Sequence, residues 1–250
     1  MSGHSRWAQI KRKKAKTDQQ RGKLFTKLIR EITVAARTGG GDPKVNMRLK
    51  AAIDAAKAAS MPQENINRAI QKGTGELSGA AFEEVTYEGY GPGGVAIMSR
   101  VLTDNKNRSA PAIRHIFEKH GGNLGTMGCV SWMFERKGLI QVDAERIEED
   151  DLLGIALEAG AADMRRAEKA FEVATAPDEM ERVRQALEQH AVPVLEAQVA
   201  MVPLSTVRVE GKDAQQVLRL VEALEEDDDV QTVYANYDIS DEVMEAISAA

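Results

Sequence analysis

The sequence predicts an α+β multidomain protein, in which an N-terminal three-helix domain is followed by two α/β sandwich domains, the third inserted in the second. Three observations support this prediction. The chain has 250 residues, more than the ~100–200 of an ordinary single domain. Apolar residues first recur at helical spacing and, after a glycine-rich segment over 73–79, at the alternating spacing of strands. Charge is also divided unevenly along the chain, which indicates separate modules.

The first 75 residues predict three short helices. Apolar side chains recur at helical spacing over 23–37, and the glycines at 39–41 end this helix. A second helix is predicted from about 46 to 59. A third follows Pro62, which suits a first helical turn, and stops at Gly73. Their alanine-rich contacts predict a small helical bundle.

The residues after this bundle predict a mixture of strands and helices. Strands over 82–88 and 95–103 flank the loop 89–94, and a helix follows Asn107. Further on, the predicted elements are strands over 129–134 and 139–142 separated at 136–138, a helix over 148–159, a strand over 167–175, a helix over 178–190, strands over 194–202 and 205–210, a helix over 213–225 and a strand over 230–238.

This order of elements predicts three domains, one of them discontinuous. Residues 1–75 are predicted to form a basic helical domain. Residues 79–134 lack a helix and a strand that residues 205–240 can supply, so these two segments are predicted to form one α+β domain. Residues 135–204 then form an inserted, acidic α+β domain. A simple sequential split near residue 140 is the alternative.

Composition excludes several classes of protein. Apolar residues make up 43% of the chain, which excludes wholesale disorder. Aromatic residues make up only 4%, which argues against a base-stacking platform. The single cysteine, Cys129, excludes a disulfide framework within the chain and a cysteine-cluster zinc site. No apolar run approaches the ~20 residues of a membrane span, and the N-terminus lacks the apolar core of a signal peptide. We therefore expect a cytoplasmic protein with no membrane contact, no metal and no cofactor.

The net charge of −6 hides a strong asymmetry. Residues 1–75 hold 17 Lys+Arg and 5 Asp+Glu, a net charge of +12, whereas residues 141–250 hold 9 and 27, a net charge of −18. A module this basic is suited to a polyanion, because phosphates displace the counterions that its charges attract. The alternative is that the basic and acidic halves of the chain simply attract each other.

No catalytic constellation is visible. Gly89-x-Gly91-x-x-Gly94 matches a dinucleotide-binding fingerprint by letter, but the residues that follow predict a strand instead of the required helix, so a turn is favoured. His115 and His120 lack further metal ligands nearby. Cys129 is predicted to be a buried, inert thiol in an apolar strand. The acidic runs 148–151 and 225–229 are interpreted as helix ends, the second one solvated. We predict that the protein is not an enzyme.

Several stretches resemble the YebC family, in family order along the whole chain. They are Gly3–Trp7, Arg21–Ile32, Met61-Pro62 with Asn65-Ile66, Tyr87–Gly94, Thr103–Asn105 with Asn107-Arg108, and His120–Gly125 through to Trp132–Phe134. The resemblance implies a helical N-terminal domain, two α/β domains and a non-enzymatic role. It also implies two functions: family members are labelled probable transcriptional regulators that bind DNA, while others act in translation, including a mitochondrial translational activator and bacterial members linked to ribosomes stalled at proline-rich stretches.

The leading hypothesis is therefore a nucleic-acid-binding regulator of gene expression. Its partner would be DNA or the ribosomal RNA of a ribosome, and we expect the protein to be a monomer. The basic segment favours phosphate positioning over base reading, since it lacks a clear recognition helix rich in Asn and Gln. The predicted nucleic-acid-binding residues are His4, Arg6, Trp7, Lys11, Arg12, Lys13, Lys14, Lys16, Arg21, Lys23, Lys27 and Arg30.

A second functional surface is predicted from glycines that let the backbone approach a ligand closely. Two structural turns are an equally good interpretation of these glycines. The candidate residues are Tyr90, Gly91, Gly93, Gly94, Lys106, Arg108, Arg114, Gly121, Gly122 and Asn123. A different class, a protein-interaction adaptor whose acidic domains hold a basic partner, would be favoured if removal of residues 1–22 left function intact. We also expect residues 1–22 to be flexible without nucleic acid.

Overall fold

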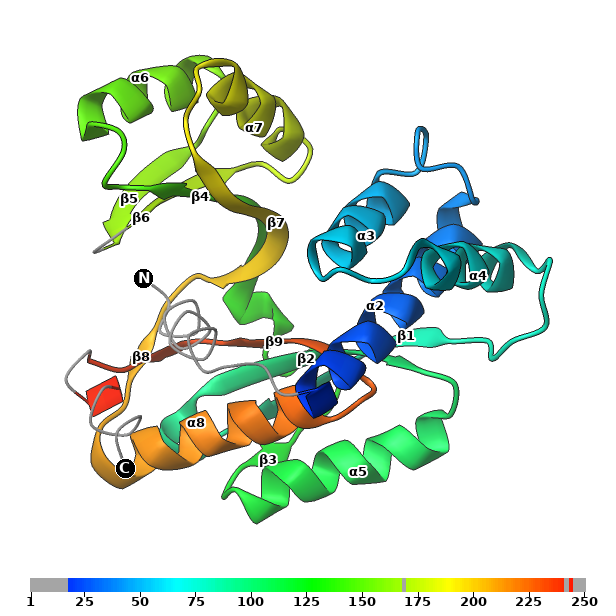
Figure 1. Cartoon of the computed structure of the whole chain (residues 1–250). Coiled ribbons are helices and arrows are strands. Elements are labelled where there is room, and N and C mark those ends of the chain that lie inside the picture. Colours follow the sequence, from blue (N-terminus) through cyan, green and yellow to red (C-terminus); the bar gives the residue numbers. More distant parts are fainter. Residues whose placement is uncertain (1–17, 168–169, 241–242, 245–250) are drawn as a thin grey trace. The chain divides into compact units, whose positions relative to one another are not determined.

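The computed structural model describes residues 18–167, 170–240 and 243–244 (Figure 1). Within these residues the chain folds into two compact units, one formed by 18–131 together with the segment from 207 onward, and the other by 132–206. The second unit is thus inserted in the first, and the predicted fold class is confirmed. The exact boundaries of the three predicted domains stay a prediction.

The N-terminal part of the first unit is a bundle of three helices. The first begins at Asp18, so residues 18–22 are helical, while residues 1–17 of the segment expected to be flexible lie outside the described residues. The bundle core is built from small and medium apolar side chains, with Ile32, Leu49 and Ile66 fully buried. The three helices are α2 (Asp18–Gly39), α3 (Met47–Ala58) and α4 (Gln63–Thr74).

The connection between α2 and α3 is fastened by Asn46, which is buried. Its side-chain oxygen accepts a hydrogen bond from the backbone N–H of Leu49 and so caps α3. Its amide nitrogen donates to the carbonyl oxygens of Ala35 and Gly40. One side chain therefore ties the end of α2 to the start of α3.

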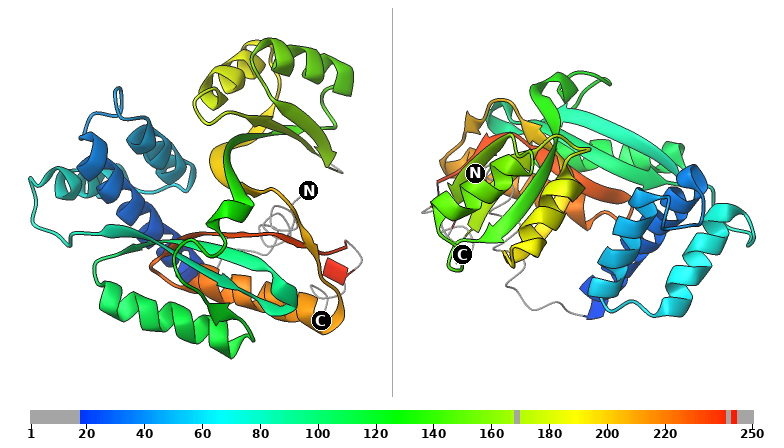
Figure 2. Two further views of the ribbon diagram at one scale, coloured as in Figure 1. Left: turned by 180° about the vertical axis from the view of Figure 1, so that it is seen from behind. Right: turned by 90° about the horizontal axis from the view of Figure 1, so that it is seen from above.

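The rest of the first unit is a four-stranded antiparallel sheet with two helices on one face (Figures 1 and 2). Apolar residues of β2, β9 and both helices form the core between sheet and helices. The strand order is β3-β1-β2-β9. The elements are β1 (Glu83–Tyr90), β2 (Ala96–Thr103), α5 (Lys106–Lys119), β3 (Asn123–Leu124), α8 (Gly211–Glu226) and β9 (Val230–Ala235), with a short parallel pair formed by β8 (Val207–Arg208) and β10 (Tyr237–Asp238).

The second unit has the same two-layer form, an antiparallel sheet in the order β5-β6-β4-β7 with two helices packed on it. Alternating residues of β4, such as Ile140 and Val142, are fully buried against the helices. Its elements are β4 (Phe134–Asp143), α6 (Glu149–Glu158), β5 (Asp163–Ala167), β6 (Ala170–Thr175), α7 (Met180–Gln189) and β7 (Val194–Pro203).

The prediction of two strands at 129–134 and 139–142 is wrong. The structure has a single strand, β4, that runs through Gly138, and residues 131–133 form a short 3₁₀ helix, η2 (Ser131–Met133). Gly138 does not mark a turn: a Cβ there would lie 2.2 Å from the Thr175 hydroxyl oxygen and 2.6 Å from the Cβ of Met180. The glycine lets α7 approach the sheet closely.

Three other predicted strands also differ from the structure. The predicted strand 167–175 belongs to two antiparallel strands, β5 and β6. The predicted strand 205–210 is reduced to the two residues of β8. The predicted strand 230–238 is interrupted at Asn236, whose buried side-chain oxygen accepts a hydrogen bond from the backbone N–H of Ala96. Side-chain hydrogen bonding of this kind competes with the regular strand ladder.

Candidate nucleic-acid interface

The described part of the predicted basic interface lies on α2. His4 to Lys16 are outside the described residues, whereas Arg21, Lys23, Lys27 and Arg30 are on the helix. The last three are spaced four and three residues apart, which places their side chains on one face of α2. The fold thus brings together three of the predicted phosphate-binding cations.

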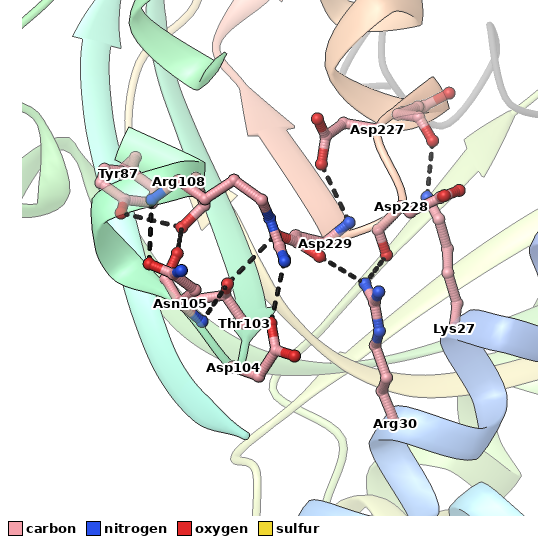
Figure 3. Close-up of polar contacts among 12 residues, drawn as sticks. Lys27, Arg30, Tyr87, Thr103, Asp104, Asn105, Arg108, Asp227, Asp228 and Asp229 are labelled. Atoms are coloured by element: carbon pink, nitrogen blue, oxygen red, sulfur yellow. Dashed lines mark hydrogen bonds and ion pairs between the residues drawn. The ribbon is translucent and has the colours of Figure 1, made fainter. Parts of the chain in front are cut away.

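These three cations meet the C-terminal end of α8, where Figure 3 shows Lys27 and Arg30. The Lys23 ammonium donates to the carbonyl oxygen of Glu226 at 3.2 Å, and the Lys27 ammonium donates to that of Glu225 at 2.5 Å. The Arg30 guanidinium donates to the carbonyl oxygen of Asp228. Cations at this position donate to backbone carbonyls that a helix end leaves without partners. They are also stabilised by the negative end of the helix dipole.

Asp229 is the centre of a polar cluster beyond the end of α8 (Figure 3). It is only 6% exposed. Its carboxylate lies 2.7 Å from the Arg30 guanidinium and 2.8 Å from that of Arg108, and it accepts a hydrogen bond from the Thr103 hydroxyl at 3.1 Å. The prediction that the run 225–229 is a solvated helix end is therefore wrong for Asp229, because long-range contacts bury it.

A second ion-pair network joins the bundle to the sheet. Glu31 of α2 pairs with Arg48 of α3 at 2.8 Å and with Arg100 of β2 at 3.0 Å, and Arg48 also pairs with Glu84 of β1. Burial by itself would raise the pKa of Glu31, but Arg100 and Arg48 hold it below its ordinary value. Arg48 is thus held in place by carboxylates of the chain itself.

The cations that remain exposed lie elsewhere on the bundle. Within residues 18–75, five exposed cations form no ion pair with another described residue. They are Arg37, Lys44, Lys50, Lys57 and Lys72. Arg37 and Lys72 line a common open pocket of about 330 Å³, whose walls come from α2, the end of α4 and the linker residues 75–82. Of these five, sequence reasoning had named none as a site residue, because they are spread along the chain.

The outer face of α4 carries a further polar feature that sequence reasoning missed. Gln63, Asn67 and Gln71 recur every four residues and are exposed, with the Gln63 amide donating to the Asn67 side-chain oxygen at 2.9 Å. Side-chain amides of this kind can hydrogen-bond base edges. The signal in the sequence is their spacing, which becomes visible once Ile66 and Ala69 are identified as the buried side of the helix.

The structure brings the two halves of the predicted second surface together. Tyr90 pairs with Asn123 where β1 meets β3, beside the 3₁₀ turn η1 (Pro92–Gly94). Gly93 has φ +69° and Gly121 has φ +77°, a left-handed backbone that favours glycine. A Cβ on Gly122 would lie 2.8 Å from the Tyr90 carbonyl oxygen. Backbone conformation and close packing therefore explain why glycine is present at these positions. A ligand-binding role stays a prediction.

Of the three cations of that predicted surface, two are ion-paired within the chain and one is exposed. Lys106 pairs with Glu83 at 2.5 Å, and Arg108 pairs with Asp104 as well as with Asp229. Arg114 is exposed on α5. The loop at 89–94 is followed by strand β2, so the interpretation of this motif as a turn instead of a dinucleotide site is confirmed.

Glu88 organises the loop that follows β3, a role with no signal in the sequence. Its carboxylate is buried and accepts hydrogen bonds from the backbone N–H groups of Gly128, Val130 and Ser131 at 2.8–2.9 Å. Cys129 therefore lies in a turn and is partly exposed, so its predicted burial in a strand is wrong. Burial and the Glu88 carboxylate raise the pKa of the Cys129 thiol.

We expect this carboxylate to stabilise the first unit in a pH-dependent way. Burial would raise the pKa of Glu88, but the three backbone donors hold it below the ordinary value. A group with a lowered folded pKa contributes stability above its unfolded pKa of about 4.3 and loses it as the pH falls through the folded pKa. Glu88→Gln should therefore be destabilising by about 1–3 kcal/mol near neutral pH, and the difference from the wild type should shrink in acid. Urea unfolding at a series of pH values measures it; a difference that does not change with pH would contradict the prediction.

Two other features are absent from the described part of the chain. It contains no group of three or more His, Cys, Asp or Glu side chains placed to hold a metal ion. No helix in it is long and apolar enough to cross a membrane.

Comparison with known proteins identifies the class of this fold. Residues 5–76 match the family model for the TACO1/YebC protein N-terminal domain, and residues 82–237 match the model for the TACO1/YebC second and third domain. The chain therefore belongs to the TACO1/YebC family.

Individual relatives agree over the full length. A "Probable transcriptional regulatory protein" of Pelotomaculum thermopropionicum is 61% identical over 243 residues, covering 96% of this chain and 100% of the relative. A protein of the same name from Syntrophus aciditrophicus is 57% identical over 250 residues, covering 100% of both chains. The crystal structure of a conserved hypothetical protein from Aquifex aeolicus, at 55% identity, superposes with a TM-score of 0.85 and covers 95% of this chain and 98% of that one.

Proposed function

We propose that the protein is a non-enzymatic, cytoplasmic regulator of gene expression that binds nucleic acid through its basic helical region. The observation that supports this most is the set of five exposed cations on α2, α3, α4 and their connections that form no ion pair with another described residue. Cations of this kind exchange condensed counterions for phosphates. The relatives' name, "Probable transcriptional regulatory protein", supports the same general role.

Phosphate contact is the main mode of binding in this proposal. Exposed lysines such as Lys50 and Lys57, seven residues apart on α3, can follow a nucleic-acid backbone without reading sequence. The exposed amides Gln63, Asn67 and Gln71 would add a modest preference for particular bases. The acidic residues of the inserted unit would be repelled by a polyanion and would stay outside the interface.

The salt dependence of binding tests this proposal. Changing Lys50 and Lys57 together to glutamine should weaken binding to all sequences and flatten the plot of log affinity against log salt by roughly 1–2 units. The matched control changes two exposed lysines outside the bundle, Lys119 and Lys212, which removes the same charge. Fluorescence anisotropy with a labelled oligonucleotide measures both. Equal slopes for the two variants would overturn the assignment of the interface.

A ribosome-associated role in translation is the second candidate. The prevalence of lysine over a dedicated groove-reading element favours it, because ribosomal RNA offers dense phosphate without one required sequence. Co-sedimentation with purified ribosomes, run beside a DNA mobility-shift assay at the same salt concentration, separates the candidates. Binding to ribosomes alone would exclude DNA as the target. Tight, sequence-selective DNA binding would exclude the ribosome as the target.

A further inference from the structure

Three cations of α2 are already occupied in the free chain. Lys23, Lys27 and Arg30 all donate to one short segment, the acidic end of α8, defined here as residues 225–229. This segment is Glu-Glu-Asp-Asp-Asp, five consecutive acidic residues. With the negative end of the helix dipole added, it presents closely spaced negative charge to the same side chains that are predicted to meet phosphates.

The contacts differ in strength. The Arg30 and Asp229 side chains are 14% and 8% exposed, and Thr103 and Arg108 also hold that carboxylate. By contrast, Lys23 makes a hydrogen bond to an exposed helix end, and an exposed interaction of this kind is worth only about 0–1 kcal/mol. The Lys27 contact is partly buried, but it also goes to a neutral backbone carbonyl instead of a carboxylate. The Arg30–Asp229 pair therefore fastens α2 to the sheet, while the lysine contacts can exchange with other anions.

We propose that the acidic end of α8 is an intramolecular competitor of nucleic acid for Lys23 and Lys27. In the free chain its backbone carbonyl oxygens accept hydrogen bonds from the two ammonium groups, and the negative charge of its carboxylates adds a longer-range attraction. A nucleic acid takes over the two ammonium groups without breaking the Arg30–Asp229 pair. A densely charged ligand gains both ammonium contacts, whereas a weakly charged ligand does not displace the acidic segment. This inference rests on the proposed nucleic-acid binding and concerns its regulation.

A double-mutant cycle tests the competition. One variant neutralises the acidic end with near-isosteric changes, Glu226→Gln, Asp227→Asn and Asp228→Asn, which keep the backbone carbonyls and leave Asp229 intact. The other removes the two ammonium groups by Lys23→Gln and Lys27→Gln. The matched control neutralises three exposed acidic residues of α6 in the inserted unit, Glu149, Asp150 and Asp151. The probe is a fluorescein-labelled oligouridylate at near-physiological salt.

The neutralised acidic end should tighten binding about fivefold, the size of one exposed charge interaction. This gain should disappear when Lys23 and Lys27 are glutamine, because the carboxylates then have no ammonium groups to attract away from the ligand. The α6 control should show little gain. The same gain in affinity with and without the two lysines, or in the α6 control, would mean general charge repulsion. Either result would overturn the proposed competition.

Lysine acetylation followed by mass spectrometry gives a second readout that needs no nucleic acid. In the wild type, Lys23 and Lys27 should react more slowly than the exposed Lys50. Neutralising the acidic end should speed up only the first two, because the carbonyl hydrogen bonds remain but the charge attraction that strengthens them is lost. If neutralising the acidic end left the acetylation rates of Lys23 and Lys27 unchanged, the proposal that it occupies these lysines would be overturned. If the wild type shows this protection but binds no nucleic acid, the proposed function fails and the competition falls with it; if it binds without coupling in the cycle, only the competition fails.

Discussion

Replacing Asp229 with alanine should lower the free energy of unfolding of the first unit by about 3–5 kcal/mol, the cost of removing one partner of a buried ion pair. The carboxylate is almost fully buried and is shared by two guanidinium groups and a hydroxyl. Its loss leaves the largely buried Arg30 without its carboxylate partner and removes the contact that joins α2 to the start of β9. We expect the bundle to loosen from the sheet as well.

The neighbouring Asp228 provides the control. Its side chain is exposed, and its contact with Arg30 uses the backbone carbonyl oxygen, which alanine keeps. Asp228→Ala should therefore change stability by no more than about 0.5 kcal/mol. Native-state hydrogen exchange of the β2 and β9 amides measures both variants in the unit concerned. If the two variants showed the same small effect, the Asp229 cluster would not hold the bundle to the sheet.

A second large effect is expected from Gly73→Ala, where α4 crosses α2. A Cβ at this position would lie 2.4 Å from the carbonyl oxygen of Thr33 and 2.7 Å from the Cβ of Ala36. Backbone and short side chains cannot move aside separately, so the two helices must separate. Overpacking of this kind costs about 1–3 kcal/mol, which outweighs the gain of about 1 kcal/mol from replacing glycine by alanine in a helix.

Gly22→Ala isolates the packing effect, because Gly22 is also in α2 and a Cβ added there would have nothing within 4 Å. This variant should be stabilising by about 0.5–1 kcal/mol through helix propensity alone. Thermal unfolding monitored by circular dichroism, with hydrogen exchange of the α2 and α4 amides, distinguishes the two changes. A Gly73→Ala protein as stable as Gly22→Ala would show that the crossing is not tightly packed.

Local sequence patterns were sufficient for most elements of the fold. The three N-terminal helices follow directly from apolar side chains at helical spacing and from the glycines and Pro62 at their ends. The hairpin around 89–94 follows from the change to alternating spacing. The order of elements also predicted the insertion, because residues 207–240 complete the sheet that residues 83–124 begin.

The errors arose where a residue's role depends on a distant contact. Gly138 has the local signature of a turn, but it lies inside β4 because α7 packs against it. Cys129 is in an apolar stretch, yet it lies in a turn because the buried Glu88 carboxylate collects the backbone N–H groups around it. A window of neighbouring residues contains no information about either partner.

The sequence by itself determined the class of fold, the position of the insertion and the excess of positive charge in the first 75 residues, because spacing and composition are local properties. Only the tertiary structure decided which of those charges are exposed. Lys23, Lys27 and Arg30 contact residues about 200 positions away, whereas Lys50 and Lys57 remain exposed. The physical reason is that a cation binds whichever carbonyl or carboxylate oxygen lies within reach, and only chain folding brings the end of α8 within hydrogen-bonding distance of α2.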